Sequence, residues 1–119
     1  MYSVQVLDHF QNPRNAGEVE DADAAAEVEN PACGDVLRLS LKISEGRISA
    51  ARFKAKGCVA AIACGSALTD LVVGKTPSEA RKLRREDVIA VIGSLPQAST
   101  HAAQLALDAL AEALSPIDQ

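Results

Sequence analysis

Hydrophobic and polar positions alternate most regularly between residues 36 and 56. In the first half of this stretch every second residue is apolar, which is the period of a half-buried strand: Leu37, Leu39, Leu41 and Ile43. In the second half, small or aromatic residues alternate with basic ones: Arg52, Lys54 and Lys56. The segment between the two halves, Ser44-Glu45-Gly46-Arg47, is typical of a turn. The pattern therefore predicts an antiparallel β-hairpin.

Helical periodicity follows the hairpin. Residues 60–73 predict a helix that ends at Gly74. The segment Thr76-Pro77-Ser78-Glu79 combines an N-cap residue, a proline in the first turn and a glutamate at the third helical position, so it starts a short helix. Residues 84–92 predict a further short helix. Residues 100–114 carry apolar side chains at i, i+3, i+4 spacing, which predicts a last helix with its apolar stripe toward the sheet.

The part of the chain before the hairpin is less regular. Residues 2–10 predict a short helix with Val4 and Leu7 on one side. An Asn-Pro-Arg-Asn-Ala-Gly segment at 12–17 ends it, because proline lacks a donor and asparagine and glycine favour turns. Residues 24–28 predict an edge strand. We therefore expect one α+β domain over residues 1–119, with a small three-stranded antiparallel sheet and helices packed mainly on one face.

Composition narrows the classes of function. The 119 residues carry a net charge of −4, which argues against nucleic acid as the main partner. No apolar stretch approaches membrane-spanning length, and the N-terminus has no secretory signal, so we expect a cytoplasmic protein with no membrane partner. Three cysteines make an odd count. Reduced cysteines in such a protein are more often metal-binding or reactive than joined in disulfides.

The predicted hairpin brings two cysteine-containing turns together. Cys33 and Asp35 precede the first strand and Cys58 follows the second, and antiparallel pairing puts these two ends side by side. Thiolates suit soft or borderline metals such as iron and zinc, and a carboxylate adds a harder, weaker ligand. The alternatives are that the cysteines are small buried hydrophobes and that Asp35 only caps its turn. The placement in glycine turns favours a metal site.

Three motifs give the chain a family resemblance over nearly its whole length. It resembles the iron–sulfur cluster assembly scaffolds of the IscU and NifU N-terminal type. The first motif is the opening helix and its turn, Leu7-Asp8-His9-Phe10-Gln11-Asn12-Pro13-Arg14-Asn15-Ala16-Gly17. The second and third are similar to the family's ligand loops: Pro31-Ala32-Cys33-Gly34-Asp35-Val36 and Gly57-Cys58-Val59-Ala60-Ala61-Ile62-Ala63.

The resemblance implies a role and a ligand set. In that family three cysteines and one aspartate surround a cluster under assembly, or zinc in purified protein. This implies Cys33, Asp35 and Cys58 as ligands of a transient iron–sulfur cluster, with zinc possible in its place. A histidine just before the family's third cysteine also approaches the site, and His101 occupies that position. The implied partners are a cysteine desulfurase, which delivers sulfur, and apo iron–sulfur acceptor proteins.

The chain also departs from the family pattern. Ala102 stands where the third cysteine is expected. The family's Hsp70-chaperone recognition stretch falls on Leu95-Pro96-Gln97-Ala98-Ser99 and is mostly lost, which argues against an Hsp70-type partner. Cys64 is a possible additional ligand that replaces the missing thiolate. However, it lies about 120° around a helix from Cys58, and it shares an apolar stripe with Ala61 and Leu68, which favours a buried, inert residue.

These observations leave one leading hypothesis and two alternatives. The leading hypothesis is a non-enzymatic scaffold or carrier for a transient iron–sulfur cluster. The first alternative is a persulfide-accepting sulfur-transfer protein that uses Cys58. The second is a zinc-bound interaction module that no longer builds clusters.

Overall fold

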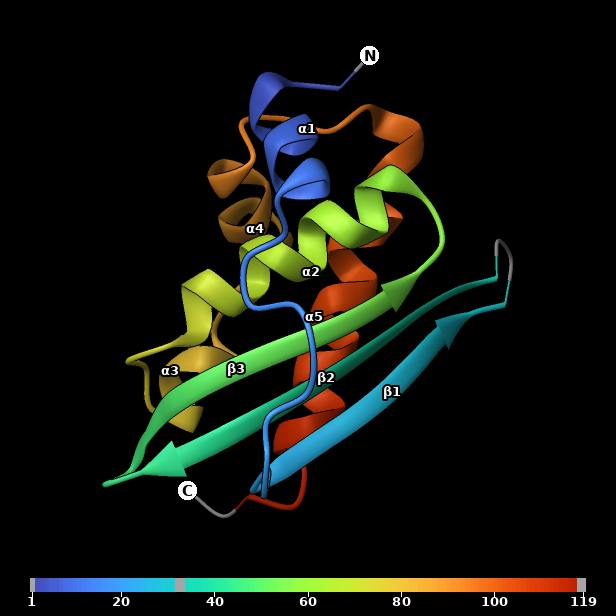
Figure 1. The fold of residues 1–119 in the computed structure, drawn as a ribbon. Coiled ribbons are helices and arrows are strands. Elements are labelled where there is room, and N and C mark those ends of the chain that lie inside the picture. The colour runs from blue at the N-terminus through green and yellow to red at the C-terminus, as the bar shows by residue number, and fades with distance from the viewer. Residues whose placement is uncertain (1, 32–33, 118–119) are drawn as a thin grey trace.

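The computed structural model describes residues 2–31 and 34–117. It has the predicted α+β architecture, in which a three-stranded antiparallel sheet of order β1-β2-β3 is packed against helices (Figure 1). The strands are β1 (Ala24–Asn30), β2 (Asp35–Ser44) and β3 (Arg47–Lys56). The helices are α1 (Val4–Gln11), α2 (Val59–Val72), α3 (Pro77–Arg81), α4 (Arg85–Val91), η1 (Gln97–Ser99) and α5 (His101–Leu114).

The hairpin of β2 and β3 follows the predicted pattern. Glu45 and Gly46 both have positive φ, 53° and 76°, as a two-residue turn that matches strand twist requires. The apolar residues Leu37, Leu39 and Leu41 are fully buried. At the far end of the hairpin Val36 pairs with Lys56, so the start of β2 lies beside the end of β3. The sheet therefore brings Asp35 next to the residues that lead into α2.

Helices α2 and α5 cover one face of the sheet, α2 over β3 and α5 over β1 and β2. Because α2 is apolar on most of its circumference, it is buried along its length. Gly65 lets it approach the sheet closely, since a Cβ at that position would lie 2.6 Å from the ring of Phe53. Short α3 begins with the predicted capping box, in which Thr76 and Glu79 exchange side-chain and backbone hydrogen bonds.

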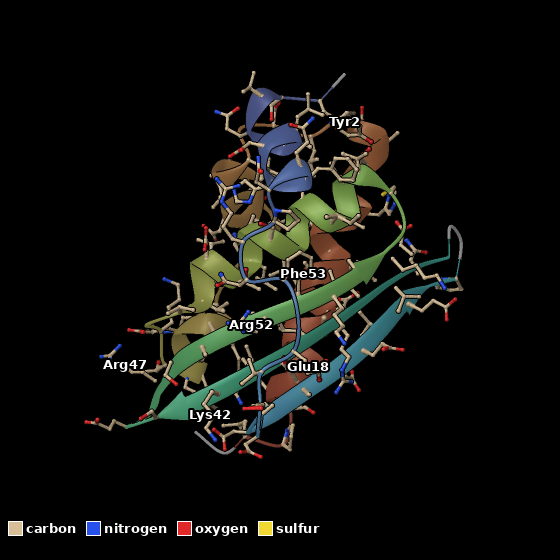
Figure 2. All side chains as sticks on the ribbon, viewed as in Figure 1. Tyr2, Glu18, Lys42, Arg47, Arg52 and Phe53 are labelled. Atoms are coloured by element: carbon tan, nitrogen blue, oxygen red, sulfur yellow. The ribbon has the colours of Figure 1, made fainter. Side chains whose placement is uncertain are left out.

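The other face of the sheet carries charged side chains, and the chain between α1 and β1 crosses it (Figures 1 and 2). Gly17 N–H donates to Phe53 O (2.8 Å), and Val19 N–H donates to Ser40 Oγ (2.9 Å). Glu18 forms ion pairs with Arg38 at 2.9 Å and with Lys54 at 3.9 Å. None of these contacts of the crossing segment involves Asp35 or Lys56, at the end of the sheet where β2 begins and β3 ends.

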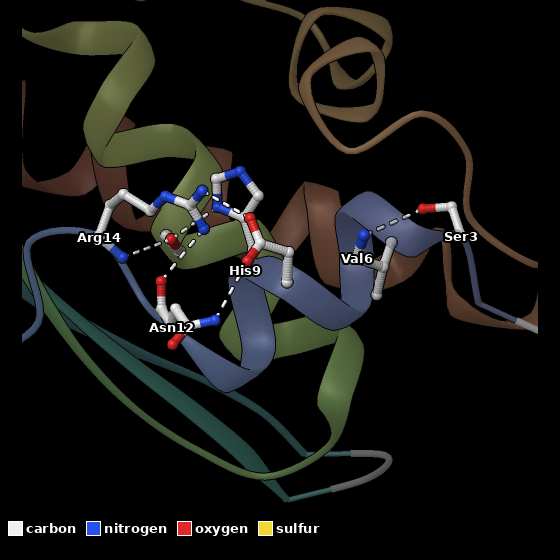
Figure 3. Close-up of polar contacts among 7 residues, drawn as sticks. Ser3, Val6, His9, Asn12 and Arg14 are labelled. Atoms are coloured by element: carbon white, nitrogen blue, oxygen red, sulfur yellow. Dashed lines mark hydrogen bonds and ion pairs between the residues drawn. The ribbon is translucent and has the colours of Figure 1, made fainter.

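Helix α1 differs from the sequence prediction. Val4 and Leu7 were expected on its apolar side, but they are 80% and 40% exposed, and the helix buries Val6 and His9 instead. Polar contacts determine which side of α1 faces the core. His9 Nδ1 lies 2.7 Å from Ser66 Oγ, which also accepts a hydrogen bond from Arg14 N–H at 2.8 Å (Figure 3). These contacts attach the end of α1 and the turn that follows it to the middle of α2.

Candidate metal centre

The N-terminus of α2 holds the central residue of the candidate site. Cys58 is the N-cap, with φ −79° and ψ 166°, and its Sγ accepts a hydrogen bond from Ala61 N–H at 3.4 Å. A sulfur atom here replaces the oxygen that serine or aspartate usually supplies at this position. The cap fixes the direction of the Cys58 side chain and leaves it half-buried.

Asp35 contacts Cys58 through both of its carboxylate oxygens. Cys58 N–H donates to Oδ1 and the Cys58 thiol donates to Oδ2, each at 3.2 Å. Asp35 is the first residue of β2 and is only 3% exposed. The sequence prediction put Asp35 just before the strand, whereas the structure places it inside. Its carboxylate thus joins the start of β2 to the start of α2.

The separation of the sulfur and oxygen atoms fits a shared metal ion. At ordinary bond lengths, a tetrahedral metal would hold a thiolate sulfur and a carboxylate oxygen about 3.5 Å apart. The observed distance between Cys58 Sγ and Asp35 Oδ2 is 3.2 Å. An ion entering between them would replace the thiol proton with little movement of either side chain.

The environment keeps the Cys58 thiol protonated. Burial of the sulfur raises the pKa of Cys58 above its usual value, and the hydrogen bond to Asp35 acts in the same direction. The hydrogen bond from the Ala61 amide lowers this pKa, but by less. A protonated thiol is a weak nucleophile, because the thiolate is the reactive form.

The other predicted ligands are placed differently. Cys33 lies outside the described residues. His101 begins α5, as predicted, and its exposed side chain lines a hollow of about 240 Å³ together with Glu29, Asn30 and Pro31. Since Asn30 pairs with Asp35, His101 is at the same end of the sheet as the site. Within residues 2–31 and 34–117, no three His, Cys, Asp or Glu side chains converge closely enough to hold a metal ion.

Cys64 lies in the core. It is fully buried on α2, in the same apolar cluster as Leu37 and Leu68. Burial raises the pKa of Cys64 to about 12. The predicted burial is therefore present. A negative charge on Cys58 would act on the pKa of Cys64 in the same direction, so the two cysteines are close enough to interact electrostatically.

Two features of the site were not predicted. One is the hydrogen bond from the Cys58 amide to Asp35, which the sequence signals only through the position of Cys58 just before a helix. The other is the fit between Asp35 and Gly57. A Cβ at Gly57 would lie 2.1 Å from Asp35 Oδ1. No periodic pattern reveals such a contact, because it joins positions that are 22 residues apart.

Comparison with known proteins defines the family of this chain. Residues 1–118 match the model of the NifU-like N terminal domain. The chain therefore belongs to this family, as its motifs indicated.

Relatives and solved structures agree with this assignment. The chain is 46% identical to the iron–sulfur cluster assembly scaffold protein IscU 1 of Archaeoglobus fulgidus, over 96% of this chain and 74% of that protein. It is 41% identical to the scaffold protein IscU of Escherichia coli, over 96% and 91% of the two chains. The crystal structure of a NifU-like protein (N-terminal) from Brucella abortus superposes with a TM-score of 0.75 at 22% identity, covering 96% of this chain and 92% of that one. That likeness confirms the fold.

Proposed function

We propose that this protein is a scaffold or carrier on which an iron–sulfur cluster is assembled and then passed to an acceptor protein. The observation that carries the proposal is the contact between Asp35 and Cys58, which places one carboxylate and one thiol at a spacing suited to a shared iron atom. The named relatives are scaffold proteins for iron–sulfur cluster assembly, which supports the same role.

The proposed ligands are Cys33, Asp35, Cys58 and His101. In the sequence Cys33 stands three residues after the end of β1 and two before Asp35, and His101 lies at the same end of the sheet. Such a set has two thiolates and two weaker ligands. Mixed ligation binds iron less firmly than four thiolates, which suits a protein that must release its cargo. The cluster is thus cargo, and zinc is the ion we expect to occupy the same ligands in purified protein.

The proposed partners follow from the same role. A cysteine desulfurase supplies sulfur, and apo iron–sulfur proteins accept the cluster. The chain does not itself turn over a substrate. No helix among the described residues is long and apolar enough to cross a membrane. We place the site in the cytoplasm, where thiols stay reduced.

The contact between Asp35 and Cys58 helps to rank the alternatives. Burial and Asp35 raise the pKa of the Cys58 thiol, which opposes persulfide attack and metal binding alike, because both need the thiolate. A bound metal ion would also be held by the carboxylate oxygen 3.2 Å from the sulfur, whereas persulfide transfer uses the sulfur alone. We therefore favour metal binding over persulfide acceptance at Cys58.

Anaerobic reconstitution tests the proposal. The protein is incubated with ferrous iron, cysteine, a cysteine desulfurase and dithiothreitol, which reduces persulfide sulfur to sulfide. We expect visible absorption from a protein-bound cluster, followed by its transfer to an apo-ferredoxin. Cys58→Ala should abolish the absorption, and Cys64→Ala should retain it.

The same experiment separates the alternatives. A persulfide on Cys58, detected by mass spectrometry without any cluster, would support sulfur transfer instead. Zinc retained at one ion per chain, with neither cluster nor persulfide, would support the interaction module.

A further inference from the structure

Gly57 ends the turn between β3 and α2, and its missing side chain leaves the space that Asp35 occupies. A Cβ built on Gly57 would lie 2.1 Å from Asp35 Oδ1 and 2.7 Å from Asp35 Cγ. It would also lie 3.1 Å from the Asp35 Cα, which belongs to the strand backbone. A rotation of the Asp35 side chain would therefore relieve only part of the clash.

Among the described glycines, Gly57 alone would place a Cβ within 4 Å of a carboxylate, and Gly46 offers a comparison. Gly57 has φ +144° and Gly46 has φ +76°, so both adopt conformations that side chains disfavour. A Cβ on Gly46, however, would meet nothing within 4 Å. Both glycines have a positive φ, but only Gly57 approaches a carboxylate closely, so Gly46 controls for the cost of placing alanine at a positive φ.

The space beside Gly57 determines where the Asp35 carboxylate can lie. From this position Oδ1 reaches the Cys58 amide and Oδ2 reaches the Cys58 sulfur, each at 3.2 Å. Asp35 is nearly fully buried, so its carboxylate has little room for another orientation on the same backbone. Moving it outward would break both hydrogen bonds and change the spacing of oxygen and sulfur.

We infer that Gly57 is a positioning residue for metal binding: it allows the Asp35 carboxylate to lie against the N-terminus of α2 and so presets the Asp35–Cys58 ligand pair before a metal arrives. The inference rests on the proposed function for its consequence, but its structural basis is a contact between protein residues alone. Ligands held in place before binding cost less to order when the ion enters.

The test compares Gly57→Ala with Gly46→Ala in the full chain, with Co²⁺ as a spectroscopic probe of the ligand set. We expect Gly57→Ala to bind Co²⁺ about ten- to a hundredfold more weakly than wild type, the usual range for residues that orient metal ligands. Its visible Co²⁺ spectrum should also change, because the oxygen ligand is displaced. Gly46→Ala should keep both the affinity and the spectrum.

Hydrogen exchange gives a second readout that needs no metal. The Cys58 amide donates to Asp35 Oδ1, so its exchange should be markedly faster in Gly57→Ala and unchanged in Gly46→Ala. Equal Co²⁺ affinity, spectrum and Cys58 exchange in the two alanine variants would overturn the inference. If the wild-type chain binds no Co²⁺, the proposed function fails; Cys58 exchange then still decides whether Gly57 positions Asp35.

A second variant approaches the same contact from the other side, in case Gly57→Ala does not fold. Asp35→Glu keeps the charge but makes the side chain one methylene longer. The space beside Gly57 is too small for this longer side chain. We expect it to bind Co²⁺ about as weakly as Asp35→Ala. Wild-type affinity in Asp35→Glu would show that close placement against Gly57 is not needed, and would overturn the inference.

Discussion

Two cysteines of α2 lie six residues apart and have opposite surroundings. Cys58 caps the helix, is half-buried and contacts Asp35 through its amide and its thiol. Cys64 lies about 1.7 turns further on, fully buried in the apolar core. Position relative to the helix N-terminus, and not the residue type, therefore decides which thiol meets polar groups. The comparison leads us to expect that Cys58 binds metal and that Cys64 does not.

The strongest way to break this comparison is to remove each thiol in turn. Cys58→Ala should reduce Zn²⁺ affinity by roughly a thousandfold or more, since even residues that only orient ligands contribute about ten- to a hundredfold. Cys64→Ala should bind Zn²⁺ as wild type does. Competition with a chromophoric chelator measures both affinities. Equal losses in the two variants would place Cys64 in the metal site.

Asp35 tests the other half of the ligand pair. Asp35→Ala removes a weak, exchangeable oxygen donor. It should bind a single metal ion more weakly, but it also removes the ligand through which we expect the assembled cluster to be released. The reconstituted cluster should therefore last several-fold longer and transfer more slowly to apo-ferredoxin. Transfer is followed by the visible spectrum of the acceptor. A variant that transfers as fast as wild type would mean that Asp35 serves only the start of α2.

The sequence predicted the framework of this site for identifiable reasons. Strand alternation and the Glu45-Gly46 turn predict the hairpin, and a hairpin necessarily joins the start of β2 to the end of β3. The capping box at Thr76 predicts α3 equally well, because its signal is local. Each of these features depends on neighbours within a few residues.

The features that the sequence did not predict depend on distant contacts. The buried side of α1 follows from the contact between His9 and Ser66, which no apolar periodicity reveals. The fit of Asp35 against Gly57 requires knowledge of the strand register in three dimensions. Cys33 stays a predicted ligand, because it lies outside the described residues. The His101 and Cys64 roles likewise stay predictions that only metal-binding experiments can decide.

Replacing His101 tests whether this residue supplies a further metal ligand besides Cys58. His101→Ala should weaken Zn²⁺ binding by at least about tenfold, since even residues that only orient metal ligands contribute that much. Because the side chain is exposed, the free energy of unfolding should change by less than about 0.5 kcal/mol. The same chelator competition and a urea titration measure the two effects. Unchanged Zn²⁺ affinity would leave Cys33, Asp35 and Cys58 as the proposed set.

Replacing Cys64 should change the stability of the fold and leave metal affinity unchanged. Cys64→Ala removes a buried sulfur from the core and should lower the free energy of unfolding by about 1 kcal/mol. Urea denaturation with a chelator present measures the change without any contribution from bound metal. Cys64→Ser is the matched control: it keeps the size but buries a hydroxyl, so it should be less stable than Cys64→Ala. Equal stability of the wild type and both variants would contradict core packing of this thiol.

A smaller effect on stability should arise at Ser66, a buried polar residue of α2. His9 is 6% exposed and contacts Ser66 of α2, and burial is the main reason why its pKa is lowered from 6.5, with Arg14 acting in the same direction. Asp70 and Asp8 act in the opposite direction but do not outweigh them. In the pH range just below 6.5 the unfolded chain therefore binds more protons than the folded one. The stability that a neutral His9 contributes is present above this range and is lost as the pH falls through it.

The test is a comparison of urea midpoints between about pH 7.5 and about pH 5.5 with a chelator present. The midpoint should fall with pH in the wild type and fall less in His9→Gln, whose amide does not titrate. His101→Gln is the matched control, because it removes an exposed histidine and leaves the contact between His9 and Ser66 in place. A loss of pH dependence in His9→Gln that is absent from this control would assign the effect to His9. If His9→Gln kept the full pH dependence of the wild-type stability, groups other than His9 would be responsible for it. The contact between His9 and Ser66 would then contribute to packing only.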